Sequence, residues 1–233
     1  MFVIKKSKLI IISILIITSL TFALCFSALV KTGVNKVDGN TVRVVLDAGH
    51  GGIDGGVSGV NTGVMESELN LAVVKKLEDL LVGAGMSVSL TRNGSAGLYG
   101  IATKNLKRKD MEKRKEIIEK SNATLVVSVH MNKYALKSRR GAQVFYKNSD
   151  EKGKLLANCV QNELNDMQEA TRKFDCLGGD YYILNCSSVP SIIAECGFLS
   201  NPEDEALLIT DEYQGKVAYA IFKGIVSYLS EAS

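Results

Sequence analysis

The sequence is poor in histidine and lacks the short motifs of several common enzyme classes. Only two of its 233 residues are histidines. The glycines that follow residue 48 do not complete a G-x-G-x-x-G dinucleotide fingerprint, because Asp54 stands where the third glycine belongs. Neither a G-x-x-x-x-G-K-[ST] phosphate loop nor a G-x-S-x-G nucleophile elbow is present. These absences argue against nucleotide binding of either kind and against a serine hydrolase of the α/β class.

Net charge is also absent from most of the chain. The sequence has 28 Lys and Arg against 25 Asp and Glu, and residues 1–30 contain three of the lysines and no acid, so the remainder is neutral. The basic stretch 104–115 is interrupted by Asp110 and Glu112 and is typical of a solvated helix face. A neutral domain without a stripe of basic and aromatic residues has no electrostatic reason to bind nucleic acid. We therefore expect no nucleic-acid partner.

Cysteine occurs five times but never in the C-x-x-C spacing of a zinc site, which argues against metal ligation by cysteine. One cysteine lies in the N-terminal segment, and four remain: Cys159, Cys176, Cys186 and Cys196. They are either buried free thiols or include a Cys176–Cys186 bridge, and the sequence leaves both alternatives open. A thiol nucleophile at Cys196 with His130 as its base is disfavoured, because no helix start or basic neighbour is evident to lower the thiol pKa.

The N-terminus has the pattern of an export signal. Three lysines among the first eight residues precede a run from Leu9 to Val30 in which every residue is apolar, Ser, Thr or Cys. A signal peptide has an apolar core of roughly 7–15 residues, and a membrane span needs about 20. Residues 1–30 therefore fit either a cleaved signal peptide or an N-terminal membrane anchor. The polar residues 31–41 that follow are interpreted as a linker.

Residues 42–233 alternate strand-like and helix-like segments, which favours one α/β domain. The expected strands lie at 42–47, 86–92, 124–130, 141–147, 180–184 and 190–195. The expected helices lie at 66–85, 107–122, 151–170 and 211–229. No internal repeat or low-complexity tract interrupts this order, so the sequence offers no second module for binding a substrate.

Both histidines stand at the end of an apolar strand, His50 within a glycine-rich stretch and His130 at the close of the third strand. In open α/β sheets, binding sites gather outside the carboxyl ends of strands, so the two histidines can converge. Glu195 ends another apolar strand, where an unpaired carboxylate is costly, and Glu66 begins a helix, where the helix dipole favours it. A His, Glu, His set is a recurrent three-ligand zinc arrangement with an open position for water. Further acidic candidates near such positions are Asp47 and Asp54.

Several motifs occur in a fixed order: "LDAGHGG" with "GVMESELNLA", then "TR", then "KR" before "SVHMN", then "VPSIIAECGFLSNPEDEALL". Together they resemble the zinc-dependent N-acetylmuramoyl-L-alanine amidases of the amidase-3 class. The resemblance covers about residues 42–230. It implies a twisted mixed β-sheet flanked by helices on both faces, in a single catalytic domain over residues 42–233. It also implies cleavage of the amide that joins the lactyl group of N-acetylmuramic acid to the L-alanine of the stem peptide.

The resemblance assigns roles by position. It implies that His50, Glu66 and His130 are the zinc ligands and that Glu195 is the catalytic carboxylate. Glu68 is the alternative to Glu66, which is preferred because the family's ligand lies four residues before an Asn-Leu pair, here at 70–71. The chain departs from the family pattern at Ser67, where Lys is frequent, and at Ile118-Glu119, where an Ala-Asn pair is frequent.

A short chain with an export segment and no wall-binding repeats resembles the germination-type amidases of spore-forming bacteria. This implies action in the spore cortex, as the step before muramic-δ-lactam formation. It also implies an extracytoplasmic protein that is secreted or membrane-anchored at the cell envelope. The expected partners are a peptidoglycan glycan strand with its stem peptides, for which the glycines around His50 leave room, and an envelope protein activator. Two alternatives stay open: a catalytically inactive peptidoglycan- or partner-binding envelope protein, and a zinc peptidase acting within the stem peptide.

Overall fold

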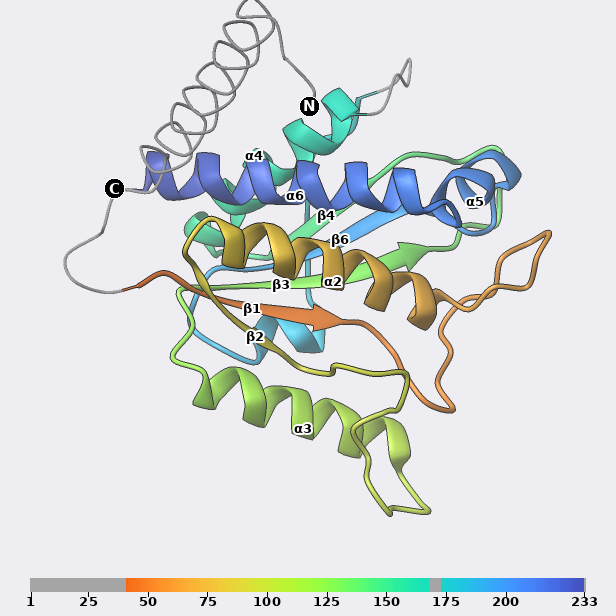
Figure 1. Ribbon diagram of the computed structural model, residues 1–233, viewed down its shortest axis with the longest axis horizontal. Coiled ribbons are helices and arrows are strands. Elements are labelled where there is room, and N and C mark those ends of the chain that lie inside the picture. Colours follow the sequence, from red (N-terminus) through yellow and green to blue (C-terminus); the bar gives the residue numbers. More distant parts are fainter. Residues whose placement is uncertain (1–40, 168–172, 233) are drawn as a thin grey trace, which may run out of the picture. The chain divides into compact units, whose positions relative to one another are not determined.

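A mixed six-stranded sheet forms the centre of the part of the chain that the computed structural model describes, residues 41–167 and 173–232 (Figure 1). The strands are β1 (Arg43–Ala48), β2 (Ser87–Leu90), β3 (Leu125–Asn132), β4 (Gln143–Lys147), β5 (Leu177–Gly179) and β6 (Ser191–Phe198). Their order across the sheet is β2-β1-β3-β6-β4-β5. β1, β2, β3 and β6 run parallel, and β4 is antiparallel to β6. The carboxyl ends of β1, β3 and β6 therefore meet at one edge of the sheet.

The apolar composition of β1, β3 and β6 explains why these three strands lie inside the sheet. β1, β3 and β6 are rich in Val, Ile, Leu and Ala, and nearly all of their residues are buried. A parallel strand covered by helices on both faces needs such continuous apolar character, because neither face meets water. β2 alternates between exposed and half-buried residues, which suits its position at the edge of the sheet.

Helices cover both faces of the sheet. They are α2 (Glu66–Gly83), α3 (Leu106–Lys120), α4 (Glu151–Met167), α5 (Pro202–Leu208) and α6 (Asp211–Glu231). Figure 1 shows α2 and α6 on one side of the sheet and α3 on the other. α2 buries Leu69, Val73 and Leu77, which recur at helical spacing. In α6, a Cβ at Gly224 would overlap the backbone of α4 at Val160, so only glycine permits this close packing.

The predicted fold, a mixed sheet flanked by helices on both faces, is confirmed. The predicted strand at 180–184 is wrong, because Tyr182–Asn185 form a 3-10 helix, η1. Its apolar residues Ile183 and Leu184 are adjacent in sequence and both buried. A strand would have directed these neighbours to opposite faces, whereas a short helical turn lets both reach the same core.

β5 and α5 have no counterpart in the sequence prediction. The start of α5 nevertheless carries a clear signal. The Asn201 side chain accepts hydrogen bonds from the backbone N–H groups of Glu203 and Asp204, and Pro202 occupies the first turn. Both features are typical of a helix N-terminus, so the stretch that follows β6 is a capped helix rather than an extended turn.

Some predictions fall outside the described residues. These are the export segment 1–30, the linker 31–41 apart from its last residue, and the last three residues of the predicted helix 151–170, since α4 is described to Met167. Within the described ranges, no helix combines the length and the apolar character that crossing a membrane requires.

The four cysteines beyond the N-terminal segment are free thiols: Cys159, Cys186 and Cys196 are buried, and Cys176 is partly exposed. The Cys176–Cys186 bridge, one of the two alternatives, is therefore not formed. Burial raises the pKa of the Cys196 thiol, which is the opposite of what a thiolate nucleophile needs. The sequence argument against Cys196 as a nucleophile is consistent with this environment.

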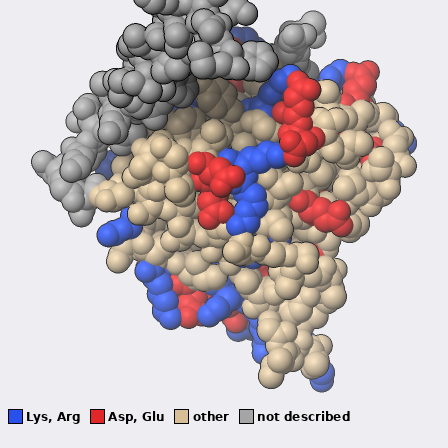
Figure 2. Space-filling model, in the orientation of Figure 1, with Lys and Arg blue, Asp and Glu red and all other residues tan. Residues whose placement is uncertain are grey.

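Charged side chains of both signs share the surface. Figure 2 shows Lys and Arg beside Asp and Glu on the face that it presents. Along α3, Arg108 pairs with Glu112 and Lys113 pairs with Glu116. Glu116 is partly exposed, and the other three are exposed. Most of the basic stretch 104–115 is therefore solvated as predicted. Asp110 and Arg114 are the exceptions, because both are buried.

Candidate metal centre

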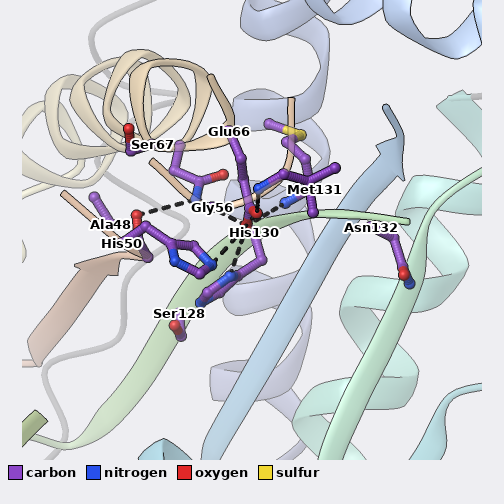
Figure 3. Close-up of polar contacts among 12 residues, drawn as sticks. Ala48, His50, Gly56, Glu66, Ser67, Ser128, His130, Met131 and Asn132 are labelled. Carbon is purple, nitrogen blue, oxygen red and sulfur yellow. Dashed lines mark hydrogen bonds and ion pairs between the residues drawn. The ribbon is translucent and has the colours of Figure 1, made fainter. Parts of the chain in front are cut away.

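Three side chains from three elements meet at the carboxyl edge of the sheet. His50 follows β1, His130 lies near the end of β3, and Glu66 is the first residue of α2. One ligand atom of each lies within 4.8 Å of the other two. Figure 3 shows both imidazole rings directed toward the Glu66 carboxylate, and the ring centroids are 5.1 Å apart. The three residues that the sequence predicts as ligands therefore come together in space.

Glu66 lies at the centre of this cluster. Its Oε1 is 2.8 Å from His130 Nδ1, and its Oε2 is 3.3 Å from His50 Nε2. The backbone N–H groups of Val57 and Met131 donate to the same carboxylate, at 2.9 and 3.2 Å. Burial favours the neutral acid, but the hydrogen bonds and charges of His130 and His50 outweigh it and hold the pKa of Glu66 far below its usual range. The carboxylate is therefore ionised and fixed by several donors.

Burial distinguishes the two glutamates that the sequence offers as ligands. Glu66 is buried within the cluster, whereas Glu68 is exposed on the surface of α2. Asn70, one turn further along α2, donates from Nδ2 to Glu66 Oε1 at 3.3 Å and to the Gly49 carbonyl at 3.1 Å. The Asn of the Asn-Leu pair thus orients the glutamate four residues before it, which gives that spacing a physical reason.

His50 is oriented by a second carboxylate. Asp54 Oδ1 lies 2.9 Å from His50 Nδ1, which leaves Nε2 directed toward Glu66. Histidines that bind metals commonly use one ring nitrogen for the ion and give the other to a carboxylate. Burial lowers the pKa of His50, but the hydrogen bonds and charges of Glu66 and Asp54 raise it overall. Asp54, an acidic candidate in the sequence, therefore serves as the partner of His50.

The glycines near His50 make room for the cluster itself. A Cβ at Gly49 would overlap the His130 ring, and a Cβ at Gly56 would overlap the Glu66 carboxylate and lie 2.8 Å from the His50 ring. The glycines around His50 are predicted from the sequence to leave room for a glycan strand. At these two positions the space is instead taken by the side chains of the candidate ligands. Gly56 also has φ +73°, a conformation that favours glycine.

A buried ionic network lies beneath the His50 loop. Asp47 in β1 accepts hydrogen bonds from Thr91 and Ser128 and forms an ion pair with Arg114 from α3. Arg114 also pairs with Asp110 one turn earlier in α3. The ion pair with Arg114 and the two hydroxyls outweigh the effect of burial and lower the pKa of Asp47. Asp47, the other acidic candidate, is therefore charged and bound away from the cluster.

Arg114 and Asp110 correct one sequence interpretation. The pattern of the stretch 104–115 is typical of a solvated helix face, yet both of these residues are buried. Asp110, Arg114 and Ile118 recur every four residues and so form one stripe of α3 that faces the sheet. The buried Ile118 at the end of this stripe is the signal that could have revealed the two charged residues before it.

Glu195 has a different environment from Glu66. It stands in β6 directly opposite His130 of β3. Its Oε2 atom is buried and, within the described residues, accepts no hydrogen bond. Burial raises the pKa of Glu195 to about 7, with the charge of Glu66 adding to the shift and those of His130 and His50 opposing it. A carboxylate with such a pKa can accept and release a proton near neutral pH.

The donor set fits a zinc ion. Two imidazole nitrogens and one carboxylate oxygen are one of the recurrent ligand sets of a catalytic zinc, which keeps its fourth position open. The unpartnered oxygen of Glu195 beside the set is the kind of group that accepts a proton from a bound water. The fold and the cluster thus define an α/β protein with a candidate three-ligand metal site at the carboxyl edge of its sheet.

Comparison with known proteins identifies the family within this class. The profile of the Amidase_3 family, described as N-acetylmuramoyl-L-alanine amidase, matches residues 44–227. The match covers most of the chain, and the protein belongs to this family. The resemblance noted from the sequence motifs is therefore confirmed.

Three relatives show how close the similarity is. The germination-specific N-acetylmuramoyl-L-alanine amidase of Bacillus subtilis (strain 168) is 35% identical over 192 residues, covering 81% of this chain and 80% of the relative. N-acetylmuramoyl-L-alanine amidase AmiA of Escherichia coli (strain K12) is 28% identical, covering 83% and 78%. The CwlD amidase of Clostridioides difficile, solved in complex with the GerS lipoprotein, superimposes with a TM-score of 0.79 at 38% identity, covering 82% of this chain and all of that one.

Proposed function

We propose that the protein is a zinc-dependent amidase that cleaves the bond between N-acetylmuramic acid and L-alanine in peptidoglycan. The observation that carries the proposal is the cluster of His50, Glu66 and His130, with the unpartnered carboxylate of Glu195 beside it. Membership of the N-acetylmuramoyl-L-alanine amidase family supports the same reaction.

In this proposal the two histidines and Glu66 hold the metal. Zinc at such a site supplies a Lewis acid that lowers the pKa of a bound water from about 15.7 to roughly 7 and polarises a carbonyl. Glu195 Oε2 accepts the proton of the attacking water and delivers it to the departing nitrogen of L-alanine. Burial raises the pKa of Glu195 above its ordinary value in the metal-free protein, which favours the protonated form that must deliver a proton to the departing nitrogen.

Three substitutions test these roles. We expect His50→Ala and His130→Ala to lose bound zinc, because each removes one of three ligands. Glu195→Ala should retain zinc and lose turnover by a factor of at least about 10². Zinc content by atomic absorption and release of stem peptides from purified peptidoglycan are the two measurements. Glu68→Ala on the exposed face of α2 is the matched control. Full activity in Glu195→Ala would contradict the assignment.

Two alternative functions would use the same residues: peptidoglycan binding without cleavage, and cleavage within the stem peptide. The reaction products distinguish both from the amidase. A protein that binds peptidoglycan without cutting it releases no stem peptide, with or without a chelator. A zinc peptidase that acts within the stem peptide leaves L-alanine on the sugar, which mass spectrometry of the products detects. The amidase proposal requires chelator-sensitive release of a stem peptide that begins with a free L-alanine amine.

We further propose an extracytoplasmic site of action, with residues 1–30 directing export as a signal peptide or membrane anchor and residues 42–233 forming the catalytic domain. The similarity to a germination-specific amidase favours spore cortex as the substrate. The structure of a relative in complex with a lipoprotein favours an envelope protein as a partner. Parallel digestion of cortex-type and vegetative peptidoglycan tests the first point, because a cortex enzyme should release more product from cortex.

A further inference from the structure

We infer that Arg92 and Arg114 are positioning residues that fix the backbone of the His50 loop and thereby set the affinity of the metal site. The inference rests on the proposed zinc site, because it concerns how one of its ligands is held. Among the described residues, neither guanidinium group forms a hydrogen bond with the side chain of His50, Glu66 or His130. Both arginines act on this cluster through backbone carbonyls, and both are buried, at 4% and 1% exposure.

The two guanidinium groups bind three consecutive carbonyls at the end of β1. Arg114 donates from Nη1 to Ala48 at 2.8 Å and from Nη2 to His50 at 2.6 Å. Arg92 donates from Nε to Ala48 at 2.8 Å and from Nη2 to Gly49 at 3.0 Å. The loop that carries the first candidate ligand is thus held at every peptide from 48 to 50.

Arg92 also connects this loop to the second candidate ligand. Its Nη2 donates to the carbonyl of Ser67, the residue after Glu66, at 2.7 Å. One nitrogen therefore joins the peptide before His50 to the peptide that follows Ser67, one residue beyond Glu66. Among the described residues, no carboxylate forms an ion pair with Arg92, and its printed hydrogen bonds all go to backbone carbonyls, including Gly94. A buried arginine that binds only backbone carbonyls fixes the geometry of the backbone and neutralises no acid.

The His50 backbone needs such support. His50 has φ +61°, in the left-handed region that residues with a Cβ seldom adopt. Its neighbours are glycines, which add conformational freedom to the unsupported loop. A residue persists in such a conformation only when the surrounding structure over-determines it. The bond from Arg114 to the His50 carbonyl fixes the peptide that follows this residue, and so holds the imidazole in the direction of Glu66.

The substitution Arg92→Lys is the sharpest test. It keeps the positive charge but replaces a planar fork of donors by one ammonium, which cannot bind the four carbonyls that Arg92 holds in the same geometry. Because Arg92 makes no ion pair, the substitution breaks none. Arg114→Lys is the second variant, and Arg108→Lys, on the exposed face of the same helix as Arg114, is the matched control.

Zinc affinity is measured on the full chain in mild detergent, by competition with a chromophoric chelator, together with the thermal unfolding of the zinc-free protein. We expect Arg92→Lys and Arg114→Lys to weaken zinc binding about 10–100-fold at a temperature where each is folded, and Arg108→Lys to match the wild type. Wild-type affinity in a folded Arg92→Lys protein, even with a lower unfolding temperature, would show that the arginine is merely structural and overturn the inference.

The His50→Ala protein separates this failure from failure of the proposed function. If His50→Ala binds zinc as tightly as the wild type, the proposed metal site is wrong and the inference falls with it. If His50→Ala loses zinc while both lysine variants keep it, the metal site stands and the positioning role alone is refuted.

Discussion

Replacing Glu195 by Gln should make the zinc-free protein more stable at alkaline pH. Gln has nearly the same shape but no charge, so it removes the cost of an ionised carboxylate at this buried position. Burial raises the pKa of Glu195 from 4.5 to about 7. Between these two values the folded protein holds a proton that the unfolded chain has released. The free energy of unfolding of the wild type therefore falls as the pH rises through this window.

The size of the effect follows from the two pKa values. Each tenfold difference in proton affinity corresponds to about 1.4 kcal/mol, so the full effect is about 3 kcal/mol above pH 7. Urea unfolding of the chelator-treated wild type and Glu195→Gln at pH 5 and pH 8 measures it. We expect the stability difference in favour of the variant to be about 2–3 kcal/mol larger at pH 8 than at pH 5.

An equal pH dependence of the two proteins would refute the reasoning, since it would mean that the Glu195 carboxylate ionises in the folded state as easily as in the unfolded chain. The same variant has a second, independent expectation. With zinc restored, Glu195→Gln should bind the metal and yet release no stem peptide, because an amide cannot accept the proton of the attacking water.

Two glycine substitutions test close contacts elsewhere in the fold. Gly49→Ala should abolish tight zinc binding in a chelator competition, because the added Cβ would displace the His130 ring, whereas Gly83→Ala, with open space around it, should bind zinc normally. Gly224→Ala should lower the free energy of unfolding by about 1–3 kcal/mol through its clash with the backbone of α4. Gly215→Ala, in the same helix but in open space, should raise it by about 0.5–1 kcal/mol; equal effects at the two positions would contradict the packing described.

The sequence predicts the sheet, and the meeting of the candidate ligands at its edge, for one physical reason. β1, β3 and β6 must be apolar on both faces, so each reads as a continuous apolar run, and a polar residue at its end is conspicuous. Parallel strands then bring their carboxyl ends together, which places His50, His130 and Glu195 at one edge. Glu66 needs the family resemblance as well, because two glutamates stand at the start of α2 and only the folded chain shows which one is buried.

The residues that sequence reasoning missed are those whose role depends on long-range contacts. Arg114 lies in a helix crowded with exposed charges, and nothing local distinguishes it from Arg108 except its spacing from Ile118. Besides Asp110 one turn earlier, its partners are distant in the chain: Asp47 and the carbonyls of Ala48 and His50. Arg92 likewise reaches back more than forty residues. The pattern of charges along a sequence indicates which helix faces are solvated. It does not indicate which arginine is buried and binds backbone carbonyls.

Glu66 and Glu195 have the same side chain, but their environments shift its pKa in opposite directions. Glu66 accepts backbone and side-chain hydrogen bonds and faces two imidazoles, so it stays ionised, as the proposed metal ligand must. Glu195 has a buried oxygen without a donor, so its proton is held more tightly and is exchangeable near neutral pH. Environments that push two carboxyl groups apart in pKa are the usual mark of a ligand or stabiliser beside an acid–base group. If Glu195→Gln lacks the expected pH effect while His50→Ala still loses zinc, the metal site survives and the proton carrier must be sought in another residue.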